Sequence, residues 1–246
     1  LDRHPDIEAV QLVLTDSNGV ARGKNVAREE LAALYGHGRN VAGSILGLDV
    51  TGEDVEETGL VWSVGDADQL CRPVAGTLAR APWLARPTAQ VLGTLYELDG
   101  RPAKADPRHA LARVVGRLEA RGCTPVVAVE LEFYLLERDD AGRLQPSRGL
   151  VSGARGTRID AYGLGRLDDM APLFDELCAA GRALGIPLRT LMSEYAPGQF
   201  EITLEHRADA LRAVDEAVMF KRAVRGVAAR HGCIACFMAK PFAELA

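Results

Sequence analysis

The sequence predicts an α+β protein, with a strand-rich first part followed by a second part that mixes strands and helices. Segments typical of strands and of helices follow one another without the regular alternation of a parallel doubly wound sheet, so an antiparallel-rich sheet is expected. A strong helix-start signal near residue 106 divides the chain. It predicts a first domain over residues 1–102 and a second domain over residues 103–246.

The first domain is expected to consist mostly of strands. Residues 8–16 form an apolar run typical of a strand, and a turn containing Asn and Gly leads into a second strand. Residues 27–36 have the pattern of a short helix that ends at Gly36. Residues 59–68 and 89–100 each have the composition of a further strand.

The second domain begins with a well-marked helix. Asp106 is a favourable N-cap, Pro107 suits the first helical position, and Gly122 can end the helix. A buried strand is expected next, over residues 126–137, because Val and Leu dominate this run.

Further elements of the second domain follow from apolar periodicity. Residues 168–185 and 208–230 are predicted to be helices, the second with Leu211, Val214 and Val218 on one apolar face. Residues 233–242 are interpreted as a final strand.

Charge and composition exclude several classes of partner. The net charge is -5, from 29 basic and 34 acidic residues, and no dense basic block is present to follow a phosphate backbone, so nucleic acid is not an expected partner. No apolar run is long enough for a membrane span, and the expected location is the cytoplasm. The five cysteines are an odd, sparse set, and Cys233 and Cys236 are interpreted as buried thiols rather than as a zinc or redox pair.

The run VVAVELEFYLLE carries two glutamates in an otherwise apolar segment. In a strand, Glu130 and Glu132 project from the same face about 7 Å apart. Carboxylates this close repel each other unless they share a proton, pair with a cationic side chain or bind a divalent cation. The alternative interpretation is a half-exposed strand with a polar face.

Two more glutamates occur around a Pro-Gly turn. Glu194 and Glu201 lie on either side of it in SEYAPGQFEITL, and Glu201 is placed on a strand. By itself Glu201 is typical of an exposed strand residue. Four acids on two strands of one domain, however, match the oxygen ligands that Mg²⁺ and Mn²⁺ prefer.

These segments together resemble the glutamine synthetase family. VAVELEF is similar to its Glu-x-Glu-Phe strand, SEYAPGQFE to its Glu-x-x-x-x-Gly-Gln-x-Glu segment, FMAKPF to its Phe-Met-x-Lys-Pro segment, and DPR to the start of its catalytic domain. The resemblance implies a β-grasp-like N-terminal domain followed by the first, incomplete half of the catalytic domain. It also implies that the glutamate γ-carboxylate attacks ATP and that an amine captures the resulting acyl phosphate.

Site residues are implied by the same resemblance. Glu132, Glu194 and Glu201 match ligands of the metal on the glutamate side, and Glu130 matches a ligand of the metal that bridges the ATP phosphates. Two Mg²⁺ or Mn²⁺ ions per site are therefore expected, with Glu132 and Glu194 also contacting substrate. His206 matches the adenine side of the nucleotide site. No catalytic residue is assigned.

Two departures from the family pattern shape the expectation. The printed chain stops before the Gly-Ser-Gly-x-His segment that supplies a histidine ligand, so this stretch alone is expected to be inactive. Val41 stands where enzymes that use ammonium have an Asp, and SILGLDVTGEDVEETGL is more similar to the γ-glutamylpolyamine synthetase branch. Asp49 is a possible substitute for the missing Asp.

The predicted function is ATP-dependent ligation of glutamate to a polyamine or other alkyl amine, in a homo-oligomer like a dodecameric double ring with sites between subunits. Ordinary glutamine synthetase, and a non-catalytic scaffold or inactive fragment of the family, are the alternatives.

Overall fold

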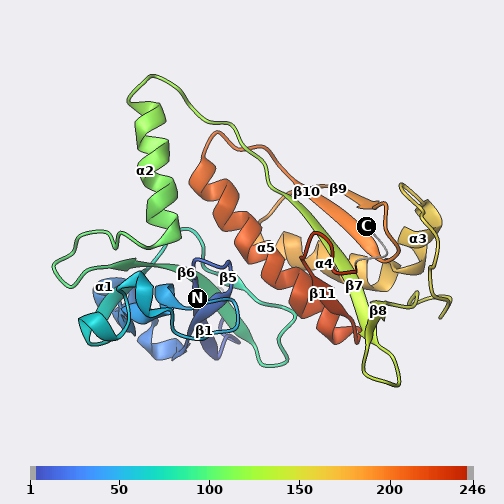
Figure 1. The fold of residues 1–246 in the computed structure, drawn as a ribbon, viewed down its shortest axis with the longest axis horizontal. Helices are drawn as coiled ribbons and strands as arrows, with labels where there is room; N and C mark the ends of the chain where they lie inside the picture. Colours follow the sequence, from blue (N-terminus) through green and yellow to red (C-terminus); the bar gives the residue numbers. More distant parts are fainter. Residues whose placement is uncertain (1–3, 243–246) are drawn as a thin grey trace. The chain divides into compact units, whose positions relative to one another are not determined.

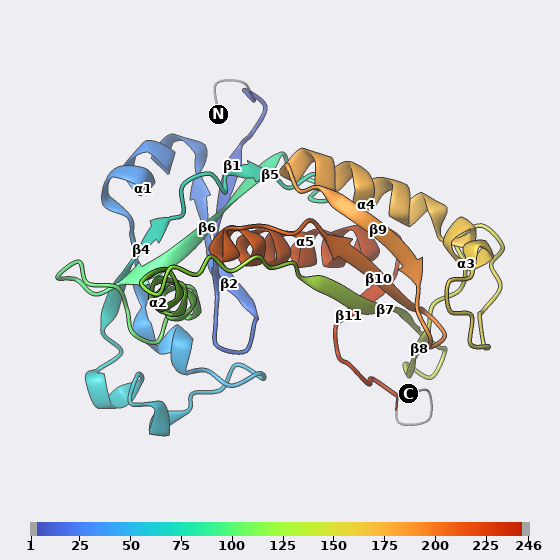
Figure 2. The same ribbon diagram turned by 90° about the horizontal axis from the view of Figure 1, so that it is seen from above.

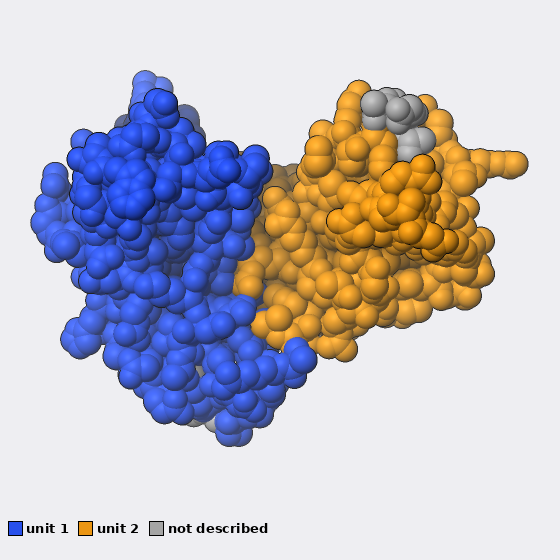
Figure 3. Space-filling view, turned by 60° about the horizontal axis from the view of Figure 1, so that its bottom comes forward, with its two compact units in different colours: residues 1–81, 85–125 blue, residues 82–84, 126–246 orange. Residues whose placement is uncertain are grey.

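The computed structural model describes residues 4–242 and divides into two compact units (Figure 1). Unit 1 comprises Leu1–Ala81 and Ala85–Pro125, and unit 2 comprises Pro82–Leu84 and Val126–Ala246 (Figure 3). Across residues 4–242, no helix combines the length and the hydrophobicity needed to cross a bilayer.

Unit 1 is built on a mixed sheet with strand order β2-β1-β6-β4-β3, and β5 pairs with β6. In this sheet β1 and β6 run parallel, and the other pairs are antiparallel. One core contains the strand residues Leu12, Val91 and Leu95 together with Leu34, which follows β2. The strands are β1 (Ala9–Thr15), β2 (Ala21–Ala27), β3 (Arg39–Ala42), β4 (Asp68–Pro73), β5 (Ala79–Arg80) and β6 (Thr88–Tyr96).

The helices of unit 1 are short, apart from α2. They are η1 (Arg28–Glu30), α1 (Leu31–His37), η2 (Gly43–Gly47), η3 (Glu56–Thr58), η4 (Trp62–Val64) and α2 (Pro107–Glu119). The hairpin predicted from residues 8–16 onward and the strand within residues 89–100 are confirmed as β1, β2 and β6.

Two predictions in unit 1 are wrong. Helix α1 continues through Gly36 and ends at His37, because the residue that adopts a positive φ, 74°, is Gly38. A side chain there would lie 2.7 Å from the carbonyl oxygen of Cys71. Residues 59–68 form turns and η4 rather than a strand, because Gly59 and Gly65 both have φ of 67°, which breaks an extended chain.

Helix α2 begins as predicted at the Asp106 cap. The Oδ1 atom of Asp106 accepts a hydrogen bond of 3.0 Å from the His109 amide, and Oδ2 accepts one of 2.8 Å from the Leu95 amide in β6. The same buried carboxylate therefore ties α2 to the sheet of unit 1, so the two units divide after Pro125. The domain boundary after residue 102 stays a prediction.

Unit 2 is an antiparallel sheet of order β11-β7-β10-β9, with β8 paired to β7 (Figure 2). Its strands are β7 (Glu130–Arg138), β8 (Leu144–Pro146), β9 (Leu188–Ser193), β10 (Gln199–Leu204) and β11 (Ile234–Cys236), and its helices are α3 (Leu164–Asp169), α4 (Ala171–Leu184) and α5 (Ala210–Arg230). The predicted antiparallel-rich α+β fold class is confirmed.

Helices α4 and α5 cover one face of this sheet. The ring of Phe174 on α4 lies 5.0 Å from that of Phe200 on β10, and Phe200 is paired with Phe133 on β7. All three rings are buried. Since neighbouring residues of a strand point to opposite faces, residues that alternate with Phe133 and Phe200 project from the face away from these helices.

The apolar face predicted for α5 is wrong. Val214 is 38% exposed, whereas the buried positions include Ala213, Ala217, Phe220 and Val224. These residues recur at helical spacing, and small alanines allow another helix to approach closely. The choice of face thus follows packing against α4 and the sheet rather than the bulk of individual side chains.

The cysteines are all unpaired thiols within the described residues. Cys233 is buried, as predicted, and Cys236 is half-buried against the cluster of Tyr134, Leu136 and Ala196.

Candidate functional site

The four predicted acids belong to strands β7, β9 and β10 and their connections. In the antiparallel pair, Glu132 lies directly opposite Glu201, and Glu130 lies opposite Thr203. Glu130 and Glu132 are both exposed, whereas Leu131 between them is buried. The prediction that these two glutamates share one face is therefore confirmed, and Glu201 joins them on it.

The Pro-Gly turn brings Glu194 to the same strand pair. The amide of Gln199 donates to the carbonyl of Ala196 over 3.0 Å, and Gly198 has φ of 77°, as a turn of this kind requires. A side chain at Gly198 would also lie 3.1 Å from the carbonyl oxygen of Leu135. The Glu194 amide donates to the carbonyl of Gln199 over 2.9 Å, which holds Glu194 beside β10.

Crowding of the carboxylates changes the acidity of Glu201. Burial of this side chain, which is 8% exposed, raises its pKa to about 7. A hydrogen bond with Glu194 and the negative charges of Glu130, Glu194 and Glu132 act in the same direction. Glu130, Glu132 and Glu194 therefore all act on the carboxyl group of Glu201.

Gln199 is a site residue that the sequence interpretation did not assign. Its Nε2 atom donates a hydrogen bond of 2.9 Å to Oε2 of Glu132, and its Oε1 atom accepts one of 3.1 Å from the Ala196 amide. Gln199 thus fixes Glu132 from the turn. The sequence could have identified Gln199 by its spacing of two residues from Glu201, which places both side chains on the same face of β10.

These acids have the donor chemistry of a site for hard divalent cations. Carboxylate oxygens are the preferred ligands of Mg²⁺ and Mn²⁺. A bound cation would offset the burial and the neighbouring negative charges that raise the pKa of Glu201. Within residues 4–242, no group of three or more His, Cys, Asp or Glu side chains is already arranged around a metal position.

A cavity of about 360 Å³ adjoins Glu194. Its walls include residues 155–160 and the end of β9. The Ser193 hydroxyl donates to the carbonyl of Asp160 over 2.7 Å, and the Tyr162 amide donates to the carbonyl of Ser193 over 2.8 Å. The loop is thereby attached to the strand that ends beside the acids, and it forms a recess next to them.

His206 lies apart from this arrangement along the chain. It is exposed and follows β10, next to Arg207, which pairs with Val127 through two backbone hydrogen bonds. Its role toward a nucleotide stays a prediction.

Val41 is a buried residue of β3. Its side chain is 5% exposed and belongs to the core of unit 1. Burial accounts for an apolar residue at this position, and the meaning of Val41 for the choice of amine stays a prediction.

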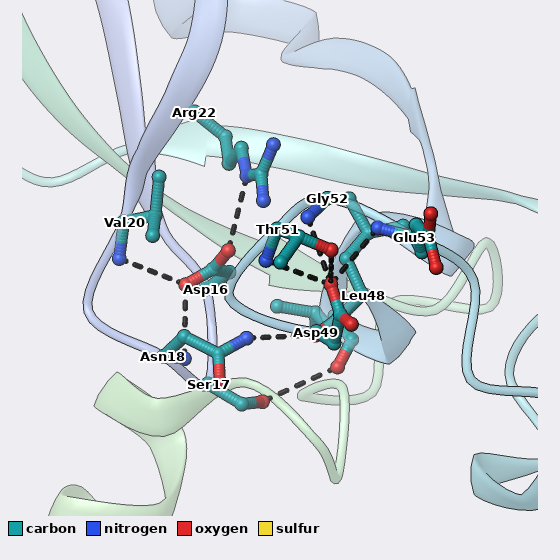
Figure 4. A network of polar contacts seen from close by, with 11 residues as sticks. Asp16, Ser17, Asn18, Val20, Arg22, Leu48, Asp49, Thr51, Gly52 and Glu53 are labelled. Atoms are coloured by element: carbon teal, nitrogen blue, oxygen red, sulfur yellow. Dashed lines mark hydrogen bonds and ion pairs between the residues drawn. The ribbon is translucent and has the colours of Figure 1, made fainter.

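Asp49 instead organises a loop (Figure 4). Its Oδ1 atom accepts hydrogen bonds from the amides of Thr51, Gly52 and Glu53 and from the Thr51 hydroxyl, at 2.7 to 3.0 Å. The bond from the Thr51 side chain, followed by those from the amides, lowers the pKa of Asp49.

Comparison with known proteins identifies relatives over nearly the whole chain. The sequence profile described as "Glutamine synthetase, catalytic domain" matches residues 104–246. The chain is 39% identical to gamma-glutamylputrescine synthetase PuuA of Escherichia coli and 32% identical to a glutamate–isopropylamine ligase of a Pseudomonas species, in each case over 99% of this chain. It covers 52% and 53% of these two proteins, so it spans about half their length.

A solved structure titled "GmaS/ADP complex" superposes with a TM-score of 0.77 at 30% identity, over 99% of this chain and 51% of that chain. These matches confirm the predicted family and the predicted α+β fold class. The division into a β-grasp-like N-terminal domain and the N-terminal part of the catalytic domain stays a prediction.

Proposed function

Because the chain belongs to the glutamine synthetase family, we propose that it contributes its acidic cluster to a site that ligates glutamate to an amine at the expense of ATP. In this reaction the γ-carboxylate of glutamate takes up the terminal phosphoryl group, and the amine nitrogen then displaces phosphate from the acyl carbon. The observation that carries the proposal is the placement of Glu132 directly opposite Glu201, with Glu130 and Glu194 acting on the same carboxyl group.

Each glutamate has a proposed role toward divalent cations, Mg²⁺ or Mn²⁺. Glu132, Glu194 and Glu201 would hold one cation and contact the glutamate side, and Glu130 would hold the second, near the nucleotide phosphates. Bound cations supply neutralisation of the charge on the transferred phosphoryl group, without which a carboxylate cannot approach a polyphosphate. His206 remains a candidate for the adenine side.

Gln199 has a positioning role in this proposal. Its amide nitrogen holds one oxygen of Glu132 at 2.9 Å, which leaves the other oxygen of that carboxylate free to turn toward a ligand. Glu194 is fixed through its backbone to the same residue. The Gln199 side chain thus orients Glu132, and its backbone carbonyl holds the backbone of Glu194 beside β10.

The proposed acceptor is an alkyl amine or a polyamine. Support comes from the names of two relatives, which act on putrescine and on isopropylamine. Ordinary glutamine synthetases are also similar to this chain, at 27% and 30% identity for those of Thermotoga maritima and Pyrococcus horikoshii. Ammonium is therefore the second candidate acceptor. A scaffold without activity is disfavoured, because repelling carboxylates with no function would be costly to retain.

We include in the proposal a cytoplasmic location and a homo-oligomer with sites between subunits, as the family resemblance implies. The proposed oligomer is a dodecameric double ring, and measuring the size of the full-length protein in solution tests it.

The test uses the protein in the full length that its gene encodes. Phosphate release from ATP should require glutamate, an amine and Mg²⁺ or Mn²⁺ together. Glu132→Gln and Glu201→Gln should each lower kcat/KM by about 100-fold or more, because each removes a charge that the phosphoryl transfer uses. Glu205→Gln is the matched control, since Glu205 pairs with Arg189 and Arg207 at the end of β10.

Activity within twofold of the unaltered enzyme in both variants would remove the acidic cluster from the reaction. Comparing kcat/KM for putrescine, isopropylamine and ammonium then decides between the two acceptor classes.

A further inference from the structure

Unit 1 contains a cavity of about 680 Å³ that the proposed ligase reaction does not use. It lies between the turn that follows β6 and the first turns of α2, and its volume is typical of small-molecule sites. Pro102 and Ala112 contribute apolar wall, and five polar residues complete the lining. All of these residues belong to unit 1.

The walls of this cavity are held in place by backbone contacts. On one side, the Glu97 amide donates to the carbonyl of Arg101 over 2.8 Å, and the Gly100 amide returns a bond of 2.8 Å to Glu97. On the other side, Nη2 of Arg113 on α2 donates to the carbonyl of Lys104 over 3.0 Å. The cavity is therefore formed before any ligand arrives.

The lining carries an excess of positive charge. Arg101, Lys104 and Arg113 are cationic, and Glu97 is the one acid among the lining residues. Arg101 is already paired, since its Nε donates to Asp99 over 2.7 Å. Within residues 4–242, neither Lys104 nor Arg113 has an acidic partner within ion-pair distance. The Lys104 ammonium and the guanidinium N–H groups of Arg113 other than the one bonded to the Lys104 carbonyl can therefore bind an anion.

The lining of the cavity also includes a buried histidine. His109 is 8% exposed, and its ring meets that of Tyr96 edge-on at 4.9 Å. Its Nε2 atom is buried and has no hydrogen-bond partner among the described residues. A buried polar atom without a partner is costly, and such atoms often mark the place of an unseen ligand or water.

We propose that this cavity binds a small organic oxyanion, a carboxylate or a phosphate monoester carried on an apolar body. Lys104 and Arg113 hold the charged oxygens, Pro102 and Ala112 contact the body, and a polar atom of the ligand completes the hydrogen bonding of His109. An inorganic anion would fill only a small part of 680 Å³ and would leave the apolar wall and His109 without contacts.

The test compares two organic probes that share one body. Phenyl phosphate and benzoate differ only in the oxyanion, and inorganic phosphate and acetate are the matched heads without the body. Calorimetric titration of the full-length protein should give binding at least tenfold tighter for phenyl phosphate than for phosphate, or for benzoate than for acetate. Whichever organic probe binds more tightly identifies the preferred oxyanion.

Variants of the lining residues test whether the probe binds in this cavity. Lys104→Ala and Arg113→Ala should each weaken the better organic probe by tenfold or more. Arg117→Ala is the control, because Arg117 is exposed on the same helix but does not line the cavity. In spectra of the ¹⁵N-labelled histidine rings, the probe should shift one ring signal in the unaltered protein, and Lys104→Ala should need at least tenfold more probe for the same shift.

Three results would overturn the proposal. The first is that neither organic probe binds below about 10 mM. The second is that both variants bind like the unaltered protein. The third is that phosphate and acetate bind as tightly as phenyl phosphate and benzoate. None of these measurements reads ligase activity, so their failure and failure of the proposed ligase function are distinguishable.

Discussion

Carboxylates gather in two regions of this molecule, one in each unit, and their surroundings are opposite. In unit 1, Asp16 and Asp49 are surrounded by N–H donors from the hairpin between β1 and β2 and from residues 51–53 (Figure 4). In unit 2, Glu130, Glu132 and Glu201 face other carboxylates.

The two surroundings shift the pKa values of Asp49 and Glu201 in opposite directions. Hydrogen bonds from Thr51 and its neighbours lower the pKa of Asp49, whereas burial and neighbouring acids raise the pKa of Glu201 to about 7. A carboxylate whose lone pairs are occupied by amides stabilises the fold and has little capacity left for a ligand. A carboxylate that faces other carboxylates destabilises the fold and gains when a cation binds.

The largest effect is expected from a carboxylate placed where there are neither donors nor water. Val41→Asp puts a charge at a core position that is 5% exposed. We expect a loss of about 4 kcal/mol or more in the free energy of unfolding, enough to prevent folding of unit 1. Urea denaturation followed by circular dichroism measures it, with Val41→Ile as the control of similar shape. Stability close to that of the unaltered protein would mean that Val41 is not in the core.

The next largest loss of stability is expected at Asp16, a buried carboxylate that accepts hydrogen bonds. Asp16 is 2% exposed and accepts from the amides of Asn18 and Val20 and from Nε of Arg22, at 2.8 to 3.0 Å. Asp16→Ala should lower the free energy of unfolding by about 3 kcal/mol, because two amides and a guanidinium lose their acceptor.

The conservative variant Asp16→Asn keeps one acceptor oxygen. Its free energy of unfolding, measured by urea denaturation, should therefore fall by less than that of Asp16→Ala. Equal losses in the two variants would show that the hydrogen bonds at Asp16 are not the source of its contribution.

At Glu201, by contrast, loss of the carboxylate charge is expected to stabilise the folded protein. Its pKa in the folded protein is about 7, above the ordinary value of 4.5, so the folded state binds more protons than the unfolded state between these values. Stability without metal should therefore fall as the pH rises from about 4.5 to 7 and stay low above that. Glu201→Gln, in a metal chelator, should raise the free energy of unfolding by about 2 kcal/mol at pH 8 and by little at pH 4.

Thermal unfolding at the two pH values checks this prediction. A variant that is less stable than the unaltered protein at pH 8 would contradict the crowding of the carboxylates. Glu205→Gln, beyond the end of β10, serves again as the control.

The smallest effect is expected at Asp49. Asp49→Ala removes the acceptor of three backbone amides, and because the site is exposed, water replaces it in part. Amide hydrogen exchange at Thr51, Gly52 and Glu53 should quicken by about tenfold or less while the rest of unit 1 is unchanged. Since the pKa of Asp49 is lowered, this protection should persist in the unaltered protein as the pH falls to 3.8, the ordinary value, and be lost only below it.

Much of the local structure was determined by the sequence alone. Asp106 followed by Pro107 set the start of α2, and the spacing of Glu130 and Glu132 set their common face. Motifs at Glu130, Glu132, Glu194 and Glu201 also sufficed for the family. Each of these conclusions depends on residues close together in the chain, whose geometry follows from backbone conformation and side-chain type.

The tertiary structure alone decided which segments meet. The register that sets Glu132 opposite Glu201, and the bond from Gln199 to Glu132 across 67 residues, depend on how two separate strands pair. Packing within unit 1 likewise put Val41 in the core, which its sequence neighbours did not reveal. Local propensity carries no information on such contacts, because their free energy arises only when distant segments bury each other's surface.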